Sequence, residues 1–71
     1  PELVAIKLVE YLGKERIMKA YKLDEEKATK ADEDEIIELI AEKKNMLKKG
    51  GIADYKKGAR ELLEKYQRHE I

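Results

Sequence analysis

Apolar residues recur along the chain at intervals of three and four positions, and no alternating pattern typical of a strand continues for more than a few residues. This spacing predicts an all-α protein, a compact bundle of about four helices. We expect the helices near residues 2–12, 14–21, 32–49 and 55–69. With 71 residues, the whole chain (1–71) can form only a single domain with a small core.

The inner faces of these helices define the expected core: Ile6, Val9, Ile17, Tyr21, Ile36, Ile40, Leu47, Tyr55, Ala59, Leu62 and Tyr66. The first helix is unusual because it is apolar almost all round, with only Glu2, Lys7 and Glu10 charged. Such a helix is normally buried on several sides, whereas so small a domain can bury only one. Its outer side is therefore expected to pack on a missing part of a longer protein or on a second copy.

The third predicted helix has a clear start. Asp32 is followed three residues later by Glu35, which is the spacing of a capping box with aspartate in the first position. The preceding segment, "DEEKATKAD" (24–32), has no apolar residue larger than alanine and is expected to be a mobile loop. Pro1 suits the first position of the first helix, and a chain that begins at proline is expected to be a piece of a longer protein.

The junction between the last two predicted helices carries four local signals. Gly50 and Gly51 are expected to end the third helix, because glycine takes the left-handed conformation of a C-cap at little cost. Asp54 is a favourable N-cap for the last helix, and Ile52 could pack as a hydrophobic staple. Gly58 lies inside that helix, where it costs about 1 kcal/mol relative to alanine. We therefore expect another backbone to approach it closely.

Charge is balanced over the chain, with 16 basic and 16 acidic residues, but it is segregated along it. Residues 24–42 hold nine acidic and two basic residues, a net charge of −7, whereas 43–60 hold seven basic residues and one acid, a net charge of +6. Part of this charge separation suits the dipole of the predicted third helix, which favours acids at its start and lysines at its end. The dipole alone explains that part of the charge separation, so it is no evidence for a bound ligand.

Catalytic and metal-binding patterns are lacking. The chain contains no cysteine and no serine, and its one histidine, His69, lies near the chain end without a positioned partner. The clustered acids of 24–26 and 32–35 lack the spacing of a calcium loop, so a solvated acidic face is expected. No phosphate-binding glycine motif occurs. We therefore expect no enzymatic activity and no cofactor in this chain, no membrane span, and a reducing, cytoplasmic location.

The basic segment "KKNMLKKGGIADYKKGAR" (43–60) has two interpretations. It could be the solvated edge of two helices joined by a turn, or it could contact phosphates through lysines that the turn brings together. Basic residues at the start of a helix interact unfavourably with its dipole, so Lys56, Lys57 and Arg60 destabilise the last helix. Residues that destabilise their own helix without a compensating contact often belong to a functional site.

The segment from residue 33 to residue 66 resembles the C-terminal helical domain of circularly permuted ribosome-assembly GTPases of the RbgA/YlqF type. In that family, a helix and a basic turn with a Gly-Gly pair are followed by a helix that begins with Asp-Tyr and ends in an aromatic residue. The upstream segment "LVEYLGKERIMKAYKL" is similar to the beginning of the same domain, which consists of a hydrophobic helix, a short helix and a Tyr-x-Leu sequence. The matching positions are Lys43, Lys44, Leu47, Gly50, Gly51, Asp54, Tyr55, Ala59, Arg60, Leu62, Leu63 and Tyr66.

This resemblance implies a non-catalytic domain that docks its parent GTPase on ribosomal RNA of the large ribosomal subunit. The parent would bind GTP and Mg in a separate GTPase domain, which would also be a partner of this chain. The expected phosphate contacts are Lys44, Lys48, Lys49, Gly50, Gly51, Lys56, Lys57 and Arg60. The alternative is a protein-interaction or scaffolding module that packs on a partner domain or self-associates through the apolar first helix.

Overall fold

The computed structural model describes residues 2–71 and confirms the all-α class, with five helices in that part of the chain instead of about four. Pro1, expected at the start of the first helix, lies outside the described residues. The helices are α1 (Glu2–Leu12), α2 (Lys14–Tyr21), α3 (Glu25–Lys30), α4 (Glu33–Lys43) and α5 (Tyr55–Gln67).

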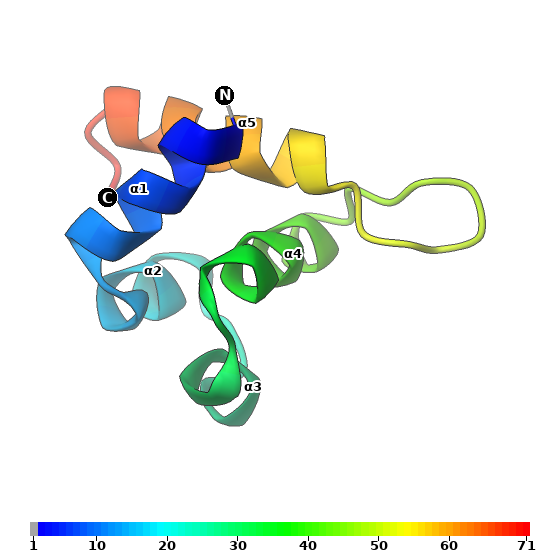
Figure 1. The fold of residues 1–71 in the computed structure, drawn as a ribbon, viewed down its shortest axis with the longest axis horizontal. Coiled ribbons are helices and arrows are strands. Elements are labelled where there is room, and N and C mark those ends of the chain that lie inside the picture. Colours follow the sequence, from blue (N-terminus) through cyan, green and yellow to red (C-terminus); the bar gives the residue numbers. More distant parts are fainter. Residues whose placement is uncertain (1) are drawn as a thin grey trace.

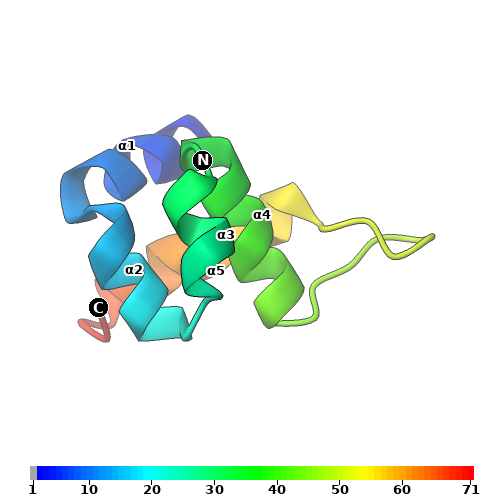
Figure 2. The same cartoon turned by 90° about the horizontal axis from the view of Figure 1, so that it is seen from below.

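The helices stack around the contact between α4 and α5, and α1 packs against both of them (Figure 1). After Gly13 the chain turns into α2, which leads to the short helix α3. This helix contacts α2 and α4 (Figure 2). The connection between α4 and α5 leaves this body and projects away from it in both views.

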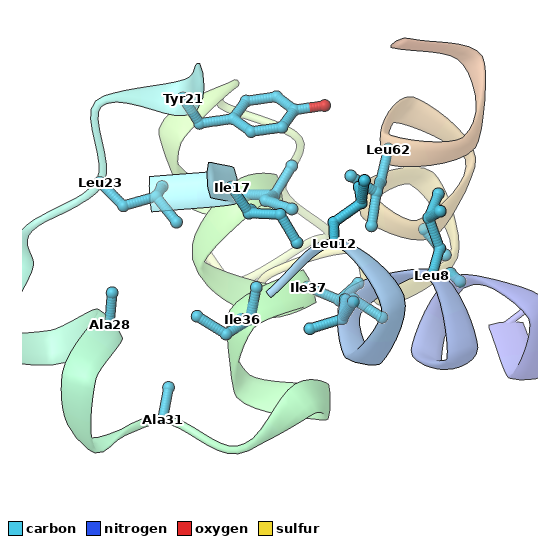
Figure 3. Close-up of a cluster of buried hydrophobic side chains, with 14 residues drawn as sticks. Leu8, Leu12, Ile17, Tyr21, Leu23, Ala28, Ala31, Ile36, Ile37 and Leu62 are labelled. Carbon is cyan, nitrogen blue, oxygen red and sulfur yellow. The ribbon is translucent and has the colours of Figure 1, made fainter. Parts of the chain in front are cut away.

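The core lies where α1, α2, α4 and α5 meet (Figure 3). Seven of the predicted core residues are buried, namely Val9, Ile17, Tyr21, Ile36, Ile40, Ala59 and Leu62. Ile6 and Tyr55 are half-buried. The prediction is wrong for Leu47, which is 42% exposed because the chain has left α4 by that point, and for Tyr66, which is 39% exposed in the last turn of α5.

The segment predicted to be a mobile loop contains α3 instead. Asp24 caps this helix, since its carboxylate accepts hydrogen bonds from the backbone amides of Glu26 (2.9 Å) and Lys27 (3.3 Å). At the other end, the ammonium group of Lys14 donates to the carbonyl oxygens of Thr29 (3.2 Å) and Ala31 (2.7 Å). A cation at the carbonyl end of a helix is favourable, so a side chain distant in sequence stabilises α3.

Alanines replace large side chains in the packing of α3. Ala28 and Ala31 are buried against the core, with 1% and 5% of their surface exposed. A sequence pattern that counts only large apolar residues misses such a helix, which explains why the loop prediction was wrong.

Both predicted N-caps are confirmed. Asp32 accepts from the amide of Glu35 at 2.9 Å, and the Glu35 carboxylate accepts from the amide of Asp32 at 3.0 Å, which completes the capping box. Asp54 caps α5 by accepting from the amide of Lys57 at 3.2 Å. These caps fix where the acidic and the basic helix begin.

The predicted end of the third helix at Gly50 is wrong, because α4 ends at Lys43. Asn45 has φ +58°, and the amides of Asn45 and Met46 donate to the carbonyl oxygens of Glu42 (3.0 Å) and Ala41 (2.7 Å). This is a Schellman motif, in which asparagine takes the left-handed position more often filled by glycine. The helix therefore stops before the glycine pair is reached.

A buried polar pair joins α2 to α5. The Tyr21 hydroxyl donates to the Glu61 carboxylate at 3.0 Å, and Glu61 is only 9% exposed. The Lys65 ammonium lies 5.1 Å from the centre of the Tyr21 ring. Burial, and then the bond to Glu61, raise the pKa of the Tyr21 phenol above its ordinary value. The pair holds the C-terminal half of α5 on the body.

Candidate nucleic-acid interface

The connection between α4 and α5 is a short hairpin, residues 46–54. The amide of Asp54 donates to the carbonyl oxygen of Met46 at 2.8 Å, and the amide of Lys48 donates to that of Ile52 at 2.6 Å. Leu47 and Ala53 pair between these bonds as an isolated antiparallel bridge. The ribbon extends away from the helices (Figures 1 and 2). We call residues 46–54 the hairpin.

The glycine pair forms the tip of the hairpin. The amide of Gly51 donates to the carbonyl oxygen of Lys48 at 3.0 Å, which closes a turn with Lys49 and Gly50 at its centre. Gly50 and Gly51 have φ of +87° and +80°, a region that strains any residue with a Cβ. Apart from the glycine and its two neighbours in the chain, no residue has an atom within 4 Å of where either Cβ would be, so the tip is open to approach.

Both ends of the hairpin are fixed to helices. The Schellman motif at Asn45 sets the direction in which the chain leaves α4, and the Asp54 cap sets the direction in which it enters α5. Tyr55 adds a third link, since its hydroxyl donates to the Asp34 carboxylate at 2.5 Å. Burial, followed by this hydrogen bond, raises the pKa of the Tyr55 phenol above its ordinary value.

The start of α5 carries Lys56, Lys57 and Arg60, all exposed. Its first turn has no acidic residue, whereas the first turn of α4 has three. Arg60 borders two shallow hollows, one with Lys56, Glu2 and Leu63 and the other with Lys57, Met46, Glu61 and Glu64. Arg60 thus lies between the two lysines and joins them into one surface.

The alternation of the ribbon places Lys48 on the same side as this surface. Successive side chains of a strand point to opposite faces, so Met46 and Lys48 share one face. Met46 borders the hollow that also contains Lys57 and Arg60. This alternation puts Lys48 on the side of the hairpin that is turned to Lys57 and Arg60. We call the exposed residues Lys48, Lys49, Lys56, Lys57 and Arg60 the basic strip.

Not all predicted site residues join this strip. Lys44, also predicted as a phosphate contact, is the C-cap of α4 and lies six residues before the glycine pair instead of on the same helix as Lys48 and Lys49. Its neighbour Lys43 borders a different hollow, between Lys22, Lys27 and Asp24. The structure separates these two lysines from the tip residues Lys48–Gly51 because α4 ends early.

The strip is not neutralised by ion pairs. Within residues 2–71, the ion pairs join Lys65 and Arg68 to Glu70 near the C-terminal end of α5. Glu61 and Glu64 lie beside Lys57 and Arg60 and reduce the local positive charge, but the Glu61 carboxylate accepts from Tyr21. The acidic segment 24–42 forms no ion pair with the strip.

Two apolar residues of the hairpin were assigned the wrong role. Leu47 was predicted in the core and Ile52 as a staple, yet they are 42% and 65% exposed. The high exposure of Ile52 shows that it does not pack as a staple, and the hairpin that carries both residues projects away from the helices (Figure 1). The glycine pair between two apolar residues was the signal for a hairpin in the sequence.

Three further features bear on the chemistry of the chain: its histidine, its possible metal ligands and the apolar character of its helices. His69, which follows the C-cap of α5, has φ +60° and is exposed. No three His, Asp or Glu side chains in residues 2–71 gather as a metal ion would require. None of the helices described has the length and apolar character needed to cross a membrane.

Comparison of the chain with family models, curated proteins and solved structures gave no match.

Proposed function

We propose that this chain is a non-catalytic RNA-docking domain, the C-terminal part of a cytoplasmic ribosome-assembly GTPase of the circularly permuted type. The resemblance of the sequence to that domain supports the proposal. In this proposal, the parent carries the GTP- and Mg-binding domain, and ribosomal RNA of the large subunit is the partner.

One observation carries the RNA contact: a strip of exposed basic residues without ion pairs. Lys48 and Lys49 occupy the tip of the hairpin, and Lys56, Lys57 and Arg60 continue the strip on α5. Neighbouring phosphates attract such a row of cations and release their counterions when it binds. The strip positions the protein on the backbone and carries little information about base sequence.

A salt titration tests this proposal. Binding of a structured ribosomal RNA fragment, followed by fluorescence anisotropy, should weaken steeply as potassium chloride rises. The Lys48→Gln/Lys49→Gln variant should flatten the slope of log K against log salt by about two. The Lys27→Gln/Lys30→Gln variant is a matched control, because it removes the same charge from exposed positions on α3. Binding that is absent at low salt, or independent of salt, would refute the proposal.

A protein-interaction function has its own supporting observation. Leu3, Val4 and Tyr11 on α1 are 68%, 58% and 75% exposed, so the outer side of α1 carries unburied apolar surface. The GTPase domain of the parent or a second copy could pack there. Val4→Ser/Tyr11→Ser should change the association state by light scattering if this face binds, and Lys48→Gln/Lys49→Gln should not.

A further inference from the structure

The hairpin combines positive charge with exposed apolar side chains in a specific order. Lys48 and Lys49 are at the turn, and Leu47 and Ile52 lie directly behind them. A loop that inserts into a membrane places its apolar side chains foremost and its cations behind, at the headgroups. The order here is reversed, which suits a partner that offers an anionic site to the tip of the hairpin and covers the apolar side chains behind it.

The two apolar residues are on opposite faces of the ribbon. Leu47 pairs with Ala53 across the bridge, so these two side chains share one face. Lys48 pairs with Ile52 through its amide, so Ile52 is on the other face. Leu47 is 42% and Ile52 is 65% exposed, so each face of the ribbon keeps apolar surface that a partner can cover. A partner that covers both must surround the hairpin on two sides.

We propose that the hairpin is a wedge that enters RNA at unpaired bases, an inference that rests on the proposed RNA-docking function. Leu47 and Ile52 contact unstacked bases on either side, as leucine and isoleucine do when they act as wedges between base steps. Lys48 and Lys49 reach phosphates beyond those bases, and the bare backbone of Gly50 and Gly51 allows close approach.

The shape of RNA determines which kinds of RNA site the hairpin can enter. A regular A-form duplex has a deep and narrow major groove that protein side chains cannot read, whereas bulges and internal loops expose bases for contact. A two-stranded ribbon needs the wider groove of a distorted site. The fixed ends of the hairpin at Asn45 and Asp54 present it in one direction, so little order has to be gained on binding.

A pair of RNAs tests the wedge: a perfect duplex, and the same duplex with a bulge of about three unpaired nucleotides. The 71-residue chain should bind the bulged RNA about tenfold more tightly than the duplex. The Leu47→Ser/Ile52→Ser variant should lose this preference and keep the affinity for duplex. Lys56→Gln/Lys57→Gln should weaken binding to both RNAs by the same factor, because its lysines contact only phosphates.

Matched controls separate the possible outcomes. Leu3→Ser/Val4→Ser removes two exposed aliphatic side chains from α1 and should leave the preference intact. Equal binding of both RNAs by the unchanged chain overturns the wedge and leaves the docking function standing. Binding of neither RNA at low salt overturns both. Capture by phosphatidylserine vesicles that depends on Leu47 and Ile52, without a preference for bulged RNA, assigns the hairpin to a membrane surface and overturns the wedge.

Discussion

A close contact between α4 and α5 depends on Gly58, which lies buried in α5. A Cβ at this position would lie 2.8 Å from the carbonyl oxygen of Ile37 and 3.0 Å from the Cβ of Ala41. Both groups belong to α4, and the nearer one is backbone that no side-chain rotation can move. The expected close approach of another backbone to Gly58 is thus confirmed.

Gly58→Ala changes the free energy of unfolding through two opposing effects, helix propensity and steric overlap. Alanine is favoured over glycine inside a helix by about 1 kcal/mol. The added methyl group forces α4 and α5 apart, and overpacking of this kind costs about 1–3 kcal/mol. Because the nearest atom is a carbonyl oxygen that cannot rotate away, we expect the steric cost to win, with a net loss of about 1 kcal/mol. Gly58→Val should lose about 3 kcal/mol, since it adds bulk at the same place.

Urea unfolding followed by circular dichroism measures this difference, provided that the slope m stays the same among the variants. Lys57→Gly and Lys57→Ala calibrate the helix propensity at the neighbouring exposed position, where nothing can clash. That pair should differ by about 1 kcal/mol in favour of alanine. If Gly58→Ala gains stability by a similar amount, the close packing of the two helices at Gly58 is refuted.

Two further predictions concern hydrogen bonds that join the elements. Asp54→Ala should lower the free energy of unfolding by about 1 kcal/mol, because the Lys57 amide loses its acceptor, while Asp54→Asn, which keeps an acceptor, should change it little in the same urea assay. For Tyr21 and Tyr55, burial and hydrogen bonding raise the folded pKa above the unfolded value near 10. Their contribution to stability is therefore complete below about pH 10 and lost above it. Tyr21→Phe/Tyr55→Phe should lose less stability between about pH 9 and 11 than the unchanged chain, and an identical loss would contradict these shifts.

Features encoded locally were predictable from the sequence. The apolar spacing of α1, α2 and α5 gave their positions, and Asp32 and Asp54 identified two helix starts because an N-cap acts within a few residues. Gly58 indicated a tight packing contact because glycine is unfavourable in a helix without one.

Features encoded by tertiary contacts or by competing signals were not predictable. The helix α3 depends on Lys14, which comes from a different helix and caps its carbonyl end. The end of α4 depends on Asn45, a weaker stop signal than the glycine pair that follows it. The sequence contains both signals, and the structure shows that the one at Asn45 ends the helix.

The early end of α4 also changes how the positive charge of the segment 43–60 is explained. In a helix that reached residue 49, Lys48 and Lys49 would have been stabilised by its negative end, which needs no ligand. In the hairpin they lie beyond the reach of that dipole, which falls off within the last turn. Lys56 and Lys57 oppose the dipole of α5. None of these four lysines forms an ion pair within residues 2–71. Neither a favourable dipole nor an ion pair within residues 2–71 stabilises these four lysines, and this is the physical ground on which we propose a contact with RNA phosphates.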